Sequence, residues 1–280
     1  MKLLHASDLL IGQGFPQLPE LASALREARL EAIRSILALA NREKVDAIVL
    51  AGNTLADTRV AHGTVVKLTS LLATSAIPIY LQPGQTDPWR ADSPYVLRSE
   101  LCKAPIHLLK DPKLPWNGPL VAVGQALEGA EYVAMPMGSP EAYEFGQGQG
   151  SVNLVTFPGA QVQQVTVGRL RWLELESDSL IDLSARLTPL ASENTLLRLK
   201  LRGIASLEDY QQFEASRSTL RFQWLEVDNQ MSIVGGKRFH HPLLRALQEK
   251  LENSQHPVSA RQAALRLDTL IAQSGKEDLV

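Results

Sequence analysis

Carboxylates follow three short apolar segments of the chain, where enzymes often hold divalent cations. Asp8 follows the first segment, Asp57 the second and Asp87 the third. Carboxylate oxygens are ligands that hard divalent cations prefer. The third turn, QPGQTDPW, nevertheless places Gln85 and Thr86 before its carboxylate. These neutral side chains are poor ligands. The turn therefore has the position of a metal site but lacks the residue types that bind metal.

The segments around these carboxylates have the pattern of an α/β domain. Residues 2–7, 45–52 and 77–84 are short and apolar, as buried strands are. Apolar residues at helical spacing predict a long amphipathic helix over 18–44 and a second helix over 63–75. This alternation predicts a parallel sheet. The loops SDLLIG, AGNTLADT and PGQTDPW would then meet at the carboxyl ends of the strands, where such sheets bind ligands.

The chain changes character after a Pro- and Gly-rich segment, in which EYVAM is expected to be a strand and GQGQG a flexible loop. From Arg169 on, RLRWLELE, NTLLRLKLRG and LRFQWLEVDN alternate apolar and polar residues, as half-exposed strands do. The helix before the last of them has Ser206 as its N-cap. We predict a layered α/β domain over 1–168, a small α+β domain with an antiparallel sheet over 169–236, and a helical tail over 237–280.

Composition excludes several classes of protein. The chain has 280 residues, of which 45% are hydrophobic and 21% charged, as in ordinary globular proteins. Its net charge of −2 lacks the basic balance of a dedicated nucleic-acid binder. No apolar run is long enough to span a bilayer and no signal peptide is recognisable, so we expect a cytoplasmic location without membrane contact. Cys102 is the single cysteine, which excludes a disulfide framework, and we expect it to be buried.

The three loops, in this order and on these segments, resemble those of the calcineurin-like metallophosphoesterases. The resemblance is closest to the SbcD-type DNA repair exonuclease branch. It runs through LHASDLLIG, KVDAIVLAGNTLAD, IPIYLQPGQTDP, EYVAMPMGSPEA and FPGAQ, over about the first 170 residues. It implies a sheet sandwich flanked by helices, a dinuclear metal centre and phosphodiesterase activity. It also implies a small capping domain, one strand of which TLLRLKLRG resembles.

The first two motifs of the family have lost most of their ligands in this chain. Asp8 corresponds to the first aspartate, but Leu10 replaces its partner histidine. Asn53 replaces the aspartate that bridges the two metals, and Asp57 lies about one residue from the later aspartate of that motif. A neutral amide cannot bridge two dications as a carboxylate does, and leucine has no imidazole.

The later motifs have also lost most of the metal ligands and the catalytic histidine of the family. Asp87 is retained, whereas Gln85 replaces a ligand asparagine and Thr86 the catalytic histidine. The final histidine pair corresponds to Met137 and Ser139, and a thioether suits Cu(I) rather than Mn²⁺ or Mg²⁺. The segment that carries the remaining histidine of the family is missing. We therefore expect no catalytic residue, no bound metal and no other cofactor.

Three hypotheses about function remain open. In the first, the chain is a pseudoenzyme, a silent SbcD-like subunit that binds an SMC-like ATPase of the SbcC type, DNA or a second copy of itself. In the second, it is an active Mn-dependent DNA exonuclease or phosphodiesterase with a rebuilt site. The polar residues available to that site are Asp8, Asn53, Asp57, His62, Gln85 and Asp87, of which Asp8, Asn53, Asp57 and Gln85 are the candidate metal ligands. In the third, the cleft binds a small molecule or nucleotide without metal.

Structural roles compete with these functional ones. We expect Asp8 to hydrogen-bond the loop after the first strand and Asp87 to stabilise its turn. His5 lies in an apolar strand and is expected to be a hydrogen-bonded histidine of the core or its rim. Met135 and Met137 are expected to fill core space.

A basic stripe in the second half has two interpretations. Arg198, Lys200 and Arg202 alternate with leucines, so on a strand they share one face. They form either the solvated face of a half-buried sheet or a binding stripe for DNA phosphates or an acidic partner. The resemblance further implies that helices after the capping domain hold the coiled-coil base of the ATPase.

Overall fold

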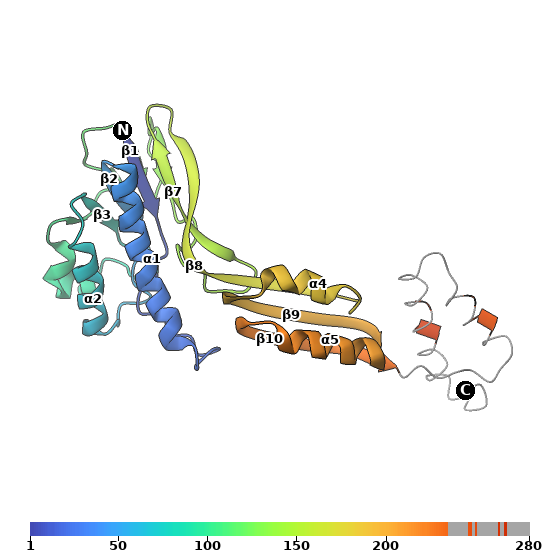
Figure 1. The fold of residues 1–280 in the computed structure, drawn as a ribbon. Helices are drawn as coiled ribbons and strands as arrows, with labels where there is room; N and C mark the ends of the chain where they lie inside the picture. The colour runs from blue at the N-terminus through green and yellow to red at the C-terminus, as the bar shows by residue number, and fades with distance from the viewer. Residues whose placement is uncertain (235–245, 248–249, 251–262, 264–265, 268–280) are drawn as a thin grey trace. The chain divides into compact units, whose positions relative to one another are not determined.

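The computed structural model describes residues 1–234, 246–247, 250, 263 and 266–267, shown as a ribbon in Figure 1. The chain divides into two compact units, Met1–Trp172 and Leu173–Val280. Nearly all of the expected helical tail, 237–280, lies outside the described residues. Within the described part, no helix has the length and apolarity needed to cross a membrane.

The first unit is built on a mainly parallel sheet. Its strands are β1 (Lys2–Ala6), β2 (Ala47–Ala51), β3 (Ile79–Gln82), β4 (Ile106–Leu108), β7 (Gly148–Thr156) and the first part of β8 (Gln161–Ser177), in the order β8-β7-β1-β2-β3-β4. Strands β1 to β4 are parallel, whereas β7 is antiparallel to both β1 and β8. The connecting helices are α1 (Ala22–Glu43), α2 (His62–Leu72), α3 (Pro94–Leu97) and the 3-10 helix η1 (Ser99–Cys102).

Alternate side chains of this sheet pack into two separate apolar layers, because successive residues of a strand point to opposite faces. One face packs on the apolar sides of α1 and α2, which lie beside the strands in Figure 1, through Leu4, Ala6, Ile48, Leu50, Ile79 and Leu81. The other face packs on a two-stranded sheet of β5 (Val121–Val123) and β6 (Tyr132–Ala134), through Leu3, Ala47, Val49 and Tyr80. The expected layered α/β architecture is confirmed.

Several local predictions for this unit are wrong. Helix α1 begins at Ala22 rather than at residue 18, because the preceding residues form hydrogen-bonded turns. The last three residues of GQGQG open strand β7 instead of forming a loop. A Cβ atom at Gly150 would lie 2.1 Å from the carbonyl oxygen of Pro140. This glycine therefore permits a close backbone contact and does not mark a flexible segment.

Two side chains expected in the core lie at the surface. Cys102 is exposed, with its thiol 3.6 Å from the carbonyl oxygen of Tyr95. The side chain of Met135 is 44% exposed and Met137 is only half-buried. Both methionines follow β6, where the chain has left the sheet, and Cys102 ends η1. Residue type alone therefore misjudged their burial.

The second unit continues β8 and adds α4 (Leu183–Leu187), η2 (Thr188–Leu190), β9 (Ser192–Ser206), α5 (Leu207–Thr219) and β10 (Phe222–Val234). The expected antiparallel sheet is wrong for its main pair, since β9 and β10 are parallel. Helix α5 joins them, and such a crossover brings the chain back to the end where β9 began. The Ser206 cap is confirmed, because its hydroxyl accepts a hydrogen bond from the N–H of Asp209 at 3.0 Å.

Candidate functional site

The loops that carry the first three motifs meet at the carboxyl ends of β1, β2 and β3, as the parallel sheet predicts. The N–H of Asp8 donates to the carbonyl of Gly52 at 3.1 Å, and that of Leu10 to the carbonyl of Asn53 at 3.0 Å. The third loop approaches so closely that a Cβ atom at Gly84 would lie 2.2 Å from the nitrogen of Asn53. Glycine is therefore required at position 84 by packing alone.

Three residues of these loops have left-handed backbone conformations. The φ angles are 52° at Asp8, 47° at Leu10 and 53° at Asn53. Such conformations cost about 1–3 kcal/mol each in residues other than glycine, and they persist only where the surroundings fix them. Here the backbone hydrogen bonds between the first two loops fix them, so both loops keep a strained geometry typical of functional sites.

The carboxylate of Asp8 is surrounded by neutral hydrogen-bond donors. Its Oδ1 accepts from the side-chain amide of Asn53 at 2.7 Å. Its Oδ2 accepts from the hydroxyl of Ser7 at 2.7 Å and from the backbone N–H of Gly138 at 3.3 Å. The expectation that Asp8 hydrogen-bonds its own loop is confirmed. Asp8 also binds a segment distant in the sequence, because Gly138 belongs to the segment that resembles the last family motif.

Asn53 connects the first loop to the third. Its Nδ2 donates to Asp8, and its Oδ1 accepts from the N–H of Thr86 at 3.1 Å and faces the Thr86 hydroxyl at 3.3 Å. The Thr86 hydroxyl also donates to the carbonyl of Leu55 at 2.7 Å. A carboxylate only accepts hydrogen bonds and a backbone N–H only donates them, so these neighbours allow the amide a single orientation.

The residues at this site do not fit a dinuclear metal centre. Asn53, which the resemblance aligns with a bridging carboxylate, is a neutral amide and directs its NH₂ group at Asp8. Only one carboxylate, Asp8, takes part in the cluster of Asp8, Asn53 and Thr86. Within the described residues, no three His, Cys, Asp or Glu side chains come together in a way that could hold a metal ion. Hard dications need several oxygen or imidazole ligands with lone pairs free.

Asp87, the remaining carboxylate of the third motif, is a buried structural residue with 0% exposure. Its Oδ1 accepts from the N–H of Gly84 at 2.7 Å and its Oδ2 from the N–H of Leu55 at 2.8 Å, and the Tyr95 hydroxyl also donates to Oδ2. Burial raises the pKa of this carboxyl, and the hydrogen bonds from Leu55, Tyr95 and Gly84, together with the backbone of Asn53, oppose that rise. The predicted stabilising role of Asp87 in its turn is confirmed.

The other polar candidates are not joined to this cluster by any hydrogen bond or ion pair between described residues. Asp57 and Gln85 are exposed, and Asp57 accepts a hydrogen bond from the N–H of Arg59. His62 is the exposed first residue of α2. His5 lies in the core, one of its two expected positions, with Nδ1 2.8 Å from the Tyr132 hydroxyl, whereas its buried Nε2 has no hydrogen-bond partner among the described residues. Burial lowers its pKa to about 4, so it is neutral at physiological pH.

Sequence reasoning missed a buried arginine that ties the motif loops together. Arg29 lies on α1 and is 2% exposed. Its guanidinium donates to the carbonyl of Leu9 at 2.8 Å, to the amide oxygen of Gln13 at 2.7 Å and to the hydroxyl of Ser139 at 3.2 Å. The rings of Phe15 and Tyr143 lie 5.6 and 5.2 Å from its charge. A charged residue on the buried face of the predicted helix, beside Ala28 and Ala32, was the signal available in the sequence.

The positive charge of Arg29 acts on a buried acid, Glu141, which is 2% exposed. Glu141 accepts hydrogen bonds from the N–H groups of Arg169 and Leu170 at 2.7 and 2.9 Å. Burial raises the pKa of Glu141 and lowers that of Arg29 to about 10, and their mutual attraction opposes both shifts. Together they hold the segment after β6 against α1 and β8.

We expect Arg29→Lys to lower the free energy of unfolding by about 1–2 kcal/mol, because an ammonium cannot reproduce the fork of the guanidinium at Leu9 and Gln13. Urea unfolding followed by circular dichroism measures this loss. Arg34→Lys is the matched control on the same helix, since Arg34 is half-exposed and paired with Glu27 and Glu31. Equal losses in the two variants would contradict a specific role for Arg29.

In the second unit, the basic stripe lies on β9 and its cations are paired with neighbouring carboxylates. Arg198 binds Glu226 through Nε at 3.1 Å, Lys200 lies 2.8 Å from Glu174, and Arg202 lies 2.9 Å from Glu176. The alternating leucines are fully buried, as the strand pattern predicted. A phosphate would have to compete with these carboxylates. The pairing favours the solvated-face interpretation, and binding of DNA or a partner by this stripe stays a prediction.

Comparisons with known proteins place solved phosphoesterases among the structures to which this fold is similar. No protein-family profile and no curated protein matches the chain. An archaeal phosphodiesterase is 10% identical with a TM-score of 0.34, over 59% of this chain and 99% of that one. YfcE, a phosphoesterase from E. coli, is 14% identical with a TM-score of 0.32, over 60% and 100%. TT1561 of Thermus thermophilus is 15% identical with a TM-score of 0.31, over 72% and 67%.

Proposed function

We propose that this chain is an SbcD-like homologue of DNA double-strand-break repair nucleases that has lost metal-dependent phosphodiesterase activity. It acts as a non-catalytic subunit or scaffold, together with an SMC-like ATPase, DNA or both. The assignment to this branch rests on the order and spacing of the motif loops in the sequence. The partners rest on the same resemblance.

The hydrogen bonding of Asn53 carries the proposal. In a metal centre this position needs a bridging anion, whereas here an amide joins Asp8 to Thr86 through one donor and one acceptor. These bonds link the loops without a cation, so the loop geometry is maintained by neutral donors. A rebuilt Mn²⁺ site made from the nearby candidates would have to break this network and draw in Asp57 and Gln85, which are exposed.

Metal content tests the proposal directly. We expect the purified chain, incubated with excess Mn²⁺ and desalted, to retain close to no manganese by elemental mass spectrometry. An Asp8→Ala variant should give the same value, because Asp8 is not a metal ligand in this proposal. About two manganese ions per chain, lost in the variant, would overturn it in favour of the active enzyme.

A nuclease assay separates the two hypotheses by a second readout. Linear double-stranded DNA with labelled ends, incubated with the chain and Mn²⁺, is expected to remain intact. End degradation that Asp8→Ala abolishes would support the active exonuclease. Degradation that Asp8→Ala leaves unchanged would identify a contaminating nuclease.

A further inference from the structure

A pocket of about 440 Å³ opens at the carboxyl ends of β3 and β4. Pro83, Pro88 and Leu109 form its apolar walls, and Gln82, Trp89 and Lys110 add polar or aromatic groups. In open α/β sheets ligands bind in the crevice at these strand ends, and small-molecule sites combine apolar walls with a few polar groups. The pocket takes Pro83, Gly84, Pro88 and Trp89 from the third motif loop, but it is not lined by Asp8, Asn53 or Thr86.

Trp89 presents an aromatic surface to solvent at this pocket. Its side chain is 47% exposed, although tryptophan is usually well covered. The turn that carries it is rigid, because Pro88 precedes it and the buried Asp87 anchors the backbone through Gly84 and Leu55. Exposed aromatic rings on rigid supports are the usual stacking surfaces for planar ligands.

Lys110 supplies a positive charge at the same place. It follows the end of β4, and its Nζ lies 5.6 Å from the centre of the Trp89 ring. Lys110 belongs to none of the ion pairs between described residues, and its ammonium lies against the Trp89 ring as a cation–π pair, to which a ligand anion would add a charge contact. The Trp89 ring can stack on a flat aromatic group of a ligand, and the Lys110 ammonium can bind an anionic group on the same ligand.

We propose that this pocket binds a planar aromatic group bearing a negative charge, with the ring stacked on Trp89 and the anion at Lys110. A nucleotide has this chemistry, either free or as an unpaired residue of a single strand. Apolar walls from the two prolines and Leu109 suit the ring, while the amide of Gln82 is already held by a hydrogen bond from its Nε2 to the carbonyl of Val123 at 2.8 Å. The binding needs no metal, so this inference is independent of the proposed loss of catalysis.

Tryptophan fluorescence tests the proposal in buffer that contains a chelator. Of the four tryptophans, Trp172 is buried and Trp116 and Trp224 are half-buried, so a stacked base should quench mainly Trp89. We expect AMP to quench the emission saturably. Adenosine, which lacks the phosphate, and ribose 5-phosphate, which lacks the base, should each bind about ten-fold more weakly.

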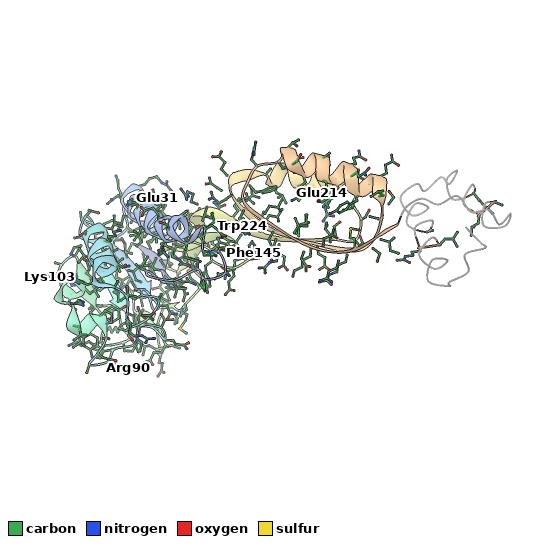
Figure 2. All side chains as sticks on the ribbon, turned by 90° about the horizontal axis from the view of Figure 1, so that it is seen from below. Glu31, Arg90, Lys103, Phe145, Glu214 and Trp224 are labelled. Carbon is green, nitrogen blue, oxygen red and sulfur yellow. The ribbon has the colours of Figure 1, made fainter. Side chains whose placement is uncertain are left out.

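Two variants test separately the stacking on Trp89 and the charge contact with Lys110. Trp89→Leu should abolish AMP binding measured by calorimetry, and Lys110→Gln should weaken AMP about ten-fold while leaving adenosine unchanged. Arg90→Gln is the matched control, since Arg90 is an exposed cation next to Trp89 but outside the pocket lining, and lies at the surface of the first unit in Figure 2. It should leave AMP binding unchanged.

A short single-stranded deoxyadenylate oligonucleotide distinguishes the two sources of the ligand. Tighter binding than AMP that Trp89→Leu abolishes would identify an unpaired strand, and binding of AMP alone would identify a free nucleotide. The proposal is overturned if neither probe binds saturably at millimolar concentration, or if Trp89→Leu binds both as the wild type does. Neither failure affects the metal-content test of the proposed function.

Discussion

Asn53→Asp is expected to lower the free energy of unfolding by about 2–3 kcal/mol at pH 8. The substitution keeps the size of the side chain and its bonds from Thr86, but it turns the donor facing Asp8 into a second anion. The two carboxylate oxygens would then meet at the present 2.7 Å hydrogen-bond distance without a proton between them. Chemical denaturation at a series of pH values measures the loss.

The pH dependence of this variant follows from the same contact. Repulsion raises the folded-state pKa of the introduced carboxyl above its unfolded value of about 3.9. A carboxyl whose folded pKa is raised contributes stability below the unfolded pKa and loses it as pH rises through the folded pKa. The difference from wild type should therefore be smallest near pH 4 and grow toward pH 8. A loss that does not change with pH would contradict the like-charge contact.

The double variant Asp8→Asn with Asn53→Asp is the matched control. It exchanges the two groups, so an amide at position 8 can donate to a carboxylate at position 53. The amide oxygen can still accept from Ser7 and Gly138, which now donate to Asp8. We expect most of the lost stability to return. Additive losses of the two single changes would instead mean that the side chains act independently.

Asp87→Asn is expected to lower the free energy of unfolding by about 3 kcal/mol, although it changes no side-chain volume. Both carboxylate oxygens face backbone donors, Oδ1 the N–H of Gly84 and Oδ2 the N–H of Leu55. An asparagine must direct its NH₂ group at one of them, which leaves a buried N–H unpaired and in contact with another donor. Urea unfolding at neutral pH measures the loss.

Tyr95→Phe separates this effect from the phenol contact. It removes only the hydroxyl that donates to Asp87 and leaves both backbone donors satisfied, so it should cost about 1 kcal/mol. A loss in Asp87→Asn no larger than that of Tyr95→Phe would contradict the requirement for two acceptor oxygens. A larger loss in Asp87→Asn would show that the stability of the fold is by itself a reason for an aspartate at position 87.

Local patterns in the sequence were enough to determine the central architecture of the first unit. Continuous apolar runs gave β1, β2 and β3, helical spacing gave α1 and α2, and their alternation gave a parallel sheet with three loops at one edge. The N-cap at Ser206 could also be predicted from the sequence, because it depends on residues only three positions apart. The replacement of ligand residue types by Asn53 and Thr86 needs no structure at all.

Only the tertiary structure decided what those residues do. Asn53 bonds Thr86 across 33 positions, and Gly138 bonds Asp8 across 130, so no local pattern contains these contacts. Burial of Arg29 depends on the segment after β6 folding back on α1. The parallel direction of β10 follows from the crossover through α5, which the sequence order contains, but only the tertiary structure shows that β9 and β10 are neighbours. Side-chain roles here follow from packing between distant segments, which sequence spacing does not specify.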